Sequence, residues 1–200
     1  MPDHRYPAAR VIGLLGGSFN PPHDGHLEIS RAALSVLQID VVWWLVSPAS
    51  PLKRPEDYEA YEARCAAARA LTDGERIEIS DFEREEGLVY TVDTIERLGA
   101  TFRDHQFIWL MGADSLDTFH LWKDWRRIAE LAPIAVFNRP GYEDAPIEST
   151  AAKALSSYRI DPRQADRMVT ETPPIWTFFS QTENATSSTE IRAQANRLND

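Results

Sequence analysis

Short apolar runs alternate with amphipathic stretches from Arg10 onward. Nearly continuous apolar runs of this length are typical of strands buried on both faces of a sheet. They predict strands at 11–15, 41–46, 107–111, 134–137 and 175–179, with a weaker, alternating strand at 76–80. Apolar residues at helical spacing predict helices after His26 and at 58–71, 91–98, 116–131, 151–158 and 187–198.

Strands alternating with helices predict a parallel sheet covered by helices. The expected fold class is therefore α/β, a doubly wound, Rossmann-like sheet. We find no internal repeat, low-complexity tract or interdomain linker, so residues 1–200 are predicted to form one domain, with 1–9 as a disordered N-terminal segment. Gly99 is expected to end the helix that begins at Thr91.

Three loops carry the polar residues that follow strands, at 16–26, 47–55 and 112–115. In an open parallel sheet, ligands bind beyond the carboxyl ends of the strands, where such loops meet. We therefore expect these three loops to share one crevice.

Charge and composition limit the kinds of partner and the location that we expect for the protein. The chain has 21 Lys and Arg against 31 Asp and Glu, a formal charge of −10, and no basic run, which argues against a nucleic-acid partner. The sequence has no run of 18 consecutive apolar residues, so no membrane span is predicted. Residues 1–9 lack the apolar core of a signal peptide. The single cysteine, Cys65, fits a reducing cytoplasm. The oligomeric state is left open.

The first of these loops combines glycines with a histidine pair. Gly16 and Gly17 lack β-carbons, so main-chain N–H groups there can approach a phosphate, although for the glycines taken alone a plain strand-to-helix turn is the better explanation. His23 and His26 stand three residues apart at a helix start, where the helix dipole favours anions. A zinc site is the rival interpretation, but no third ligand stands nearby, and we predict no protein-held metal.

Two motifs carry a family resemblance. One is Gly16-Gly17-Ser18-Phe19-Asn20-Pro21-Pro22-His23-Asp24-Gly25-His26, and the other is Ser187-Ser188-Thr189-Glu190-Ile191-Arg192. They resemble the signatures of the nucleotidylyltransferase superfamily. The middle of the chain, with Gly112-Ala113-Asp114-Ser115-Leu116, Trp122 and Asn138-Arg139-Pro140-Gly141-Tyr142, is similar to the bacterial nicotinate-nucleotide adenylyltransferases.

The resemblance implies transfer of AMP from ATP, with Mg²⁺ on its phosphates, to nicotinate mononucleotide, a step of NAD biosynthesis. It implies catalytic roles for His23, His26 and Arg192. For ATP it implies contacts with Gly16, Gly17, Ser18, Phe19, Lys53, Gly112, Asp114, Arg139, Ser187, Ser188 and Thr189, and for the nicotinate nucleotide with Asn20, Tyr90, Thr91 and Trp122. Asn20 stands where the family often has Asp, which puts a metal-holding role of that position in doubt.

Several of these residues have a structural alternative. Ser187 and Glu190 fit a capping box, and Asp114 can cap a helix. Lys53 can be a solvated surface lysine, and Trp122 can fill the core like most tryptophans. Asp93 would repel a nicotinate carboxylate at the helix start near Thr91 unless it faces away.

Two rival functions stay open at this point. Within the superfamily, the acceptor can be nicotinamide mononucleotide or phosphopantetheine. In another class, the chain can be a nucleotide-binding regulatory module without catalysis. Pyrophosphate release with each acceptor separates these alternatives.

Overall fold

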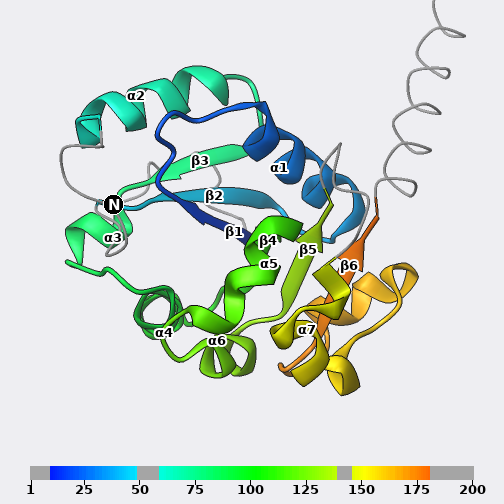
Figure 1. Cartoon of the computed structure of the whole chain (residues 1–200). Helices are drawn as coiled ribbons and strands as arrows, with labels where there is room; N and C mark the ends of the chain where they lie inside the picture. The colour runs from blue at the N-terminus through cyan, green and yellow to red at the C-terminus, as the bar shows by residue number, and fades with distance from the viewer. Residues whose placement is uncertain (1–9, 49–58, 139–145, 181–200) are drawn as a thin grey trace, which may run out of the picture.

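The computed structural model describes residues 10–48, 59–138 and 146–180. Six strands form one sheet in the order β3-β2-β1-β4-β5-β6, and every neighbouring pair is parallel (Figure 1). The strands are β1 Val11–Gly17, β2 Val41–Val46, β3 Ile77–Ser80, β4 Gln106–Gly112, β5 Ile134–Phe137 and β6 Trp176–Phe179. This order confirms the doubly wound, Rossmann-like prediction, and it places the topological switch point between β1 and β4.

Helices cover both faces of the sheet (Figure 1). The α-helices are α1 Asp24–Val36, α2 Tyr61–Leu71, α3 Phe82–Glu85, α4 Thr91–Thr101, α5 Ala113–Thr118, α6 Trp125–Leu131 and α7 Thr150–Ala154. Short 3-10 segments are η2 Phe119–Leu121, η3 Pro146–Glu148, η4 Ser156–Tyr158 and η5 Pro162–Val169. Apolar side chains of α1, α2 and η5 pack on one face of the sheet, and those of α3 to α7 pack on the other.

Strand β2 shows why the apolar runs could be recognised as strands from the sequence. All six of its residues are buried. Trp43 and Leu45 belong to the core under α4, whereas Trp44 and Val46 belong to the core under α1 and α2. A strand covered on both faces has no solvent-exposed side, so its sequence shows no alternation of polar and apolar residues.

Two glycines were assigned wrongly. The first strand runs to Gly17 instead of ending at 15, and Gly16 pairs with Leu45 inside the sheet. A β-carbon on Gly16 would lie 2.6 Å from the Trp109 ring, so close packing requires this glycine. Gly99 does not end α4, which continues to Thr101 because buried Val92, Ile95 and Leu98 hold it on the sheet.

The least regular region also departs from the prediction. The sequence indicated only one helix, near 151–158, between 141 and 165. The structure has α7 and three 3-10 segments there, and the last of them, η5, contributes buried Ala165 and Met168 to the core. Strand β3, predicted to be weak, is buried throughout, including Glu78.

Some predictions lie outside the described residues, namely the segment 1–9 and the helix at 187–198. The division into one domain of 1–200 stays a prediction. Within the described ranges, no helix is both long and apolar enough to cross a membrane.

Candidate active site

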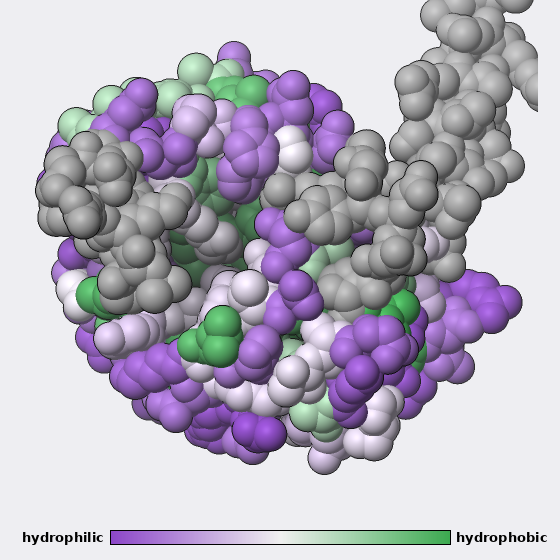
Figure 2. Space-filling model, in the orientation of Figure 1, coloured by the Kyte–Doolittle hydropathy of each residue, from purple (hydrophilic) through white to green (hydrophobic). Residues whose placement is uncertain are grey.

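The carboxyl ends of β1, β2 and β4 lie at one edge of the sheet, where the described parts of the three predicted loops begin. Strand β1 leads to His23 and α1, β2 leads to Ser47 and Pro48, and β4 leads to Gly112 and α5. Figure 2 shows the molecule hollowed between the β1–α1 connection and α5, over the ends of the strands labelled in Figure 1. Sheet topology and surface shape therefore agree on the position of the crevice.

The two histidines of the first motif meet at the start of α1. Their ring centroids are 3.9 Å apart, and His23 is the residue that precedes the helix. The main-chain N–H of His23 donates to Nδ1 of His26 at 3.3 Å. A ring nitrogen that accepts carries no proton, so this geometry leaves Nε2–H as the donor of a neutral His26. The turn thus selects the tautomer that can offer a hydrogen bond.

A buried aromatic stack supports His26 from below. Phe19, only 1% exposed, lies 4.6 Å from the His26 ring and stacks on Trp44 at 4.7 Å. Trp44 Nε1–H donates to Ser30 Oγ, and the Ser30 hydroxyl donates to the carbonyl of His26. Phe19 also has a φ of 47°, a left-handed conformation that costs a non-glycine residue roughly 1–3 kcal/mol. Its burial and stacking offset that cost and fix the imidazole.

The remaining residues of this loop hold its shape. The carbonyl of Gly17 accepts the Ser47 N–H, which ties the ends of β1 and β2 together. Asn20 Oδ1 accepts the main-chain N–H of Glu59 at 3.0 Å, so this amide joins the loop to the approach of α2. Ser18 is half-buried and its carbonyl accepts from Arg64.

On the other face of the sheet, the start of α4 approaches the segment that carries Trp122. Lys123 Nζ lies 4.6 Å from the centre of the Tyr90 ring and 3.0 Å from an Asp93 carboxylate oxygen. Lys123 therefore pairs with Asp93 and reduces the repulsion that the Asp93 carboxylate was expected to exert on a nicotinate carboxylate. Trp122 is half-buried and meets Trp109 and Phe119 edge to face. The predicted residues Tyr90, Thr91 and Trp122 thus belong to one neighbourhood.

The third loop follows β4. Gly112 precedes α5, and Asp114 lies in the first turn of that helix with its side chain exposed. The capping alternative for Asp114 is wrong, because the residue at the cap position is Gly112. A contact of Asp114 with a ribose hydroxyl stays a prediction.

Sequence reasoning missed a buried carboxylate beside the crevice. Glu83 is 5% exposed and accepts the hydroxyls of Ser47 at 3.0 Å and Thr94 at 2.9 Å. Burial raises its pKa, although the two hydroxyl groups oppose that shift. Glu83 links the end of β2 to α4. No local pattern in the sequence marks it, because the contact joins three segments.

Several predicted residues lie outside the described residues: Lys53, Arg139, Ser187, Ser188, Thr189 and Arg192. Their convergence on the histidines stays a prediction. In the part of the chain that the structure describes, no three His, Cys, Asp or Glu side chains gather as metal ligands.

A separate cavity of about 450 Å³ lies at the opposite edge of the sheet. Gln106, Phe107 and Pro133 line it, at the amino ends of β4 and β5. Because the strands are parallel, this cavity and the histidine pair lie at opposite ends of the sheet.

Comparison with known proteins identifies the family. The family model described as cytidylyltransferase-like matches residues 14–194. A probable nicotinate-nucleotide adenylyltransferase of Gluconacetobacter diazotrophicus is 44% identical over 93% of this chain and 86% of its own length. The corresponding protein of Bradyrhizobium sp. is 45% identical over 90% and 94%.

A solved structure agrees with the fold. The Plasmodium falciparum nicotinic acid mononucleotide adenylyltransferase complexed with NaAD has a TM-score of 0.62 at 15% identity, over 86% of this chain and 75% of that one. From the family model and the close relatives together, this chain belongs to the nicotinate-nucleotide adenylyltransferases, within the cytidylyltransferase-like family of nucleotidyltransferases.

Proposed function

We propose that this protein transfers the AMP moiety of ATP to nicotinate mononucleotide, releasing pyrophosphate and forming nicotinate adenine dinucleotide for NAD biosynthesis. The observation that carries the proposal is the His23–His26 pair, held on a buried stack at the switch point of the sheet. The names of relatives above 40% identity supply the acceptor.

The chemistry asks for positioning and charge stabilisation more than for a base. A phosphate monoester has a second pKa of about 6, so the acceptor phosphate is already a dianion at neutral pH. It attacks the α-phosphorus of ATP, the bond to the β-phosphate oxygen breaks, and pyrophosphate leaves with that electron pair. Reactions of this type are accelerated mainly by alignment and by donors to the charged oxygens.

His26 is proposed to donate Nε2–H to the α-phosphate oxygens as charge develops, with His23 beside it. Main-chain groups at Gly16, Gly17 and Ser18 and the turn at Phe19 are proposed to approach the ATP phosphates. Lys53, Ser187, Ser188, Thr189 and Arg192 are proposed to bind the triphosphate, and Gly112, Asp114 and Arg139 the adenosine side. Asn20, Tyr90, Thr91 and Trp122 are proposed for the nicotinate nucleotide.

Adenylyl transfer from ATP generally uses a divalent cation. We propose that Mg²⁺ enters bound to ATP, because Mg²⁺ usually keeps several waters and needs few protein ligands. The cytoplasmic location expected from the sequence stays a prediction.

The test is release of pyrophosphate from ATP with three acceptors: nicotinate mononucleotide, nicotinamide mononucleotide and phosphopantetheine. We expect nicotinate mononucleotide to give the highest kcat/KM, because main-chain N–H donors prepared for a carboxylate are left unsatisfied by an amide NH₂. A protein that binds ATP and releases no pyrophosphate with any acceptor would instead be a regulatory module.

A further inference from the structure

Helix α2 contributes a buried arginine that the proposed reaction does not use directly. Arg64 is 1% exposed, although arginine is among the side chains least often buried. It belongs to the second turn of a helix that offers no predicted catalytic residue. Keeping a guanidinium out of water is costly unless its N–H groups are satisfied, so its partners indicate what it does.

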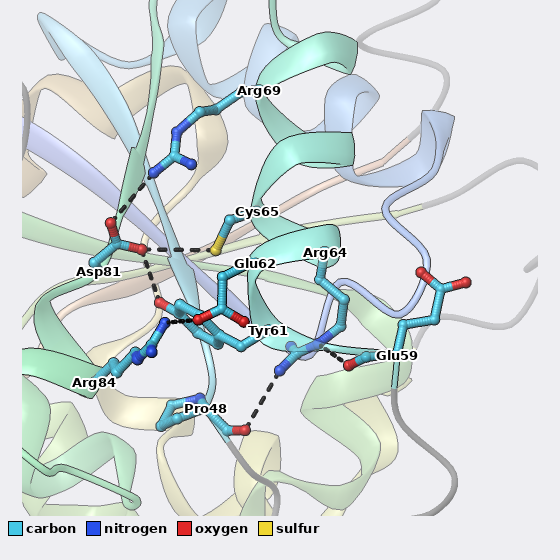
Figure 3. Close-up of polar contacts among 9 residues, drawn as sticks. All are labelled: Pro48, Glu59, Tyr61, Glu62, Arg64, Cys65, Arg69, Asp81 and Arg84. Carbon is cyan, nitrogen blue, oxygen red and sulfur yellow. Dashed lines mark hydrogen bonds and ion pairs between the residues drawn. The ribbon is translucent and has the colours of Figure 1, made fainter.

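Among the described residues, four main-chain carbonyl groups from three segments accept hydrogen bonds from Arg64. Nη1 donates to the carbonyls of Ser18 and Ser47, the latter at 2.9 Å. Nη2 donates to Pro48 at 3.3 Å, and Nε donates to Glu59 at 3.2 Å. Figure 3 shows the guanidinium between the strand end at Pro48 and the approach to α2 at Glu59. A planar fork of five N–H groups can serve carbonyls in several directions, which an ammonium cannot do with the same geometry.

The positions of these carbonyls matter because of what adjoins them. Ser18 is in the motif loop, one residue before Phe19 and five before His23. Ser47 and Pro48 follow the end of β2, at the edge of the sheet where the crevice lies, and Glu59 precedes α2. The main chain of Glu59 is held twice, since its N–H also donates to Asn20 Oδ1. The motif loop proposed to meet the triphosphate is thus joined through one side chain to the end of β2 and to the approach of α2.

We propose that Arg64 is a positioning residue for ATP: its guanidinium fixes the separation between the β1–α1 loop, which leads to the histidine pair, and the main chain that follows β2 and precedes α2. This inference rests on the proposed function for the identity of the nucleotide. It assigns Arg64 no contact with substrate. Loss of the Arg64 guanidinium lets these segments move apart. A displacement of roughly 1 Å among catalytic groups can lower the rate by up to about 100-fold.

The test compares Arg64→Lys with Arg76→Lys in the full chain. Arg76 is a matched control, because it also donates to two main-chain carbonyls, those of Asp40 and Leu34, but at the amino edge of the sheet. Dissociation constants for ATP and for nicotinate mononucleotide are measured by calorimetry well below each variant's Tm. For Arg64→Lys we expect ATP to bind about tenfold or more weakly and kcat to fall, while nicotinate mononucleotide binds within about twofold of wild type. Arg76→Lys should leave both dissociation constants unchanged.

A purely structural role would give another pattern. Activity would then fall only with the folded fraction, and the two dissociation constants would stay the same or change together; either result overturns the proposal. If Arg64→Lys does not fold, Asn20→Ala tests the same junction through the other contact of the Glu59 main chain. Because Asn20 is itself proposed to contact the nicotinate nucleotide, the readout in that variant is the ATP dissociation constant alone. The proposal expects a several-fold loss of ATP affinity, and an unchanged ATP dissociation constant contradicts it.

The result is separable from the proposed function. If the wild-type protein releases no pyrophosphate with nicotinate mononucleotide, the proposed function fails. The ratio of ATP dissociation constants between Arg64→Lys and wild type still decides the role of Arg64.

Discussion

The N-termini of α1 and α4 face the crevice from opposite sides of the sheet, and they differ in how they can bind an anion. At the start of α1 stand two imidazoles, of which His26 packs against the buried Phe19–Trp44 stack. At α4, the first turn contains a carboxylate, Asp93, that is balanced by Lys123. The α1 start thus offers imidazole donors beside a helix dipole, and the α4 start offers a dipole beside an aspartate that a lysine already pairs with.

This difference suits two different anions. A triphosphate carries several charges that shift during the reaction, so donors fixed at the right tautomer are most valuable there. A nicotinate carboxylate keeps one charge throughout, and it can be met by main-chain N–H groups and an aromatic platform. Changes at α1 should therefore alter the rate of the chemical step, and changes at α4 should alter binding of the acceptor.

His26→Ala is expected to have the largest effect. It removes the proposed donor to the α-phosphate, and loss of one preorganised donor typically lowers kcat by about 100-fold or more. Steady-state kinetics with saturating ATP measures this directly. His120→Ala is the control, since His120, on η2, is hydrogen-bonded to the main-chain carbonyl of Asp117 in α5. An unchanged kcat with a raised KM would show that His26 acts in ground-state binding instead.

Trp122→Ala should come next and should act on the acceptor alone. Stacking of an aromatic side chain on a heterocyclic base is worth about 1–3 kcal/mol, so the KM for nicotinate mononucleotide should rise about tenfold. The KM for ATP should stay within about twofold, and Trp122→Phe should recover part of the loss. If the two KM values rise together, Trp122 is core support for Trp109 and Phe119.

Lys123→Ala probes the balance at α4. Removing the cation exposes the acceptor to an uncompensated Asp93, and we expect a several-fold rise in the KM for nicotinate mononucleotide. The double variant with Asp93→Asn should return most of the way to wild type. Both side chains are about 40% exposed, so solvent screens the pair and the free energy of unfolding should change little. Failure of the double variant to recover would remove Asp93 from the electrostatics of the site.

The smallest effect concerns Glu83, between these regions. Its pKa is raised in the folded protein, so the folded state binds more protons and stability falls as pH rises from about 4.5 through the folded pKa. Glu83→Gln removes that dependence. The variant should therefore gain stability relative to wild type as pH increases from 4.5 through the folded pKa of Glu83. Urea unfolding at several pH values measures the difference, and a constant difference would mean that Glu83 does not titrate in this window.

Local sequence was informative where one segment carries the whole signal. Strand β2 and strand β5 were predicted at their observed bounds because continuous apolar runs of this length fit only buried strands. The histidine pair could be predicted because a three-residue spacing at a helix start places the two side chains next to each other. The sequence was misleading at Gly16, since a glycine in a loop and a glycine under a tryptophan ring look the same in one dimension.

The sequence by itself determined the alternation of strands and helices, the order of the loops and the family motifs. Tertiary structure alone decided that Arg64 joins Ser18, Pro48 and Glu59, that Glu83 links Ser47 to Thr94, and that Lys123 neutralises Asp93. The physical reason is the range of the interactions. Periodicity and turn chemistry are properties of neighbouring residues, whereas hydrogen bonds and charge pairs depend on which distant segments the sheet places side by side.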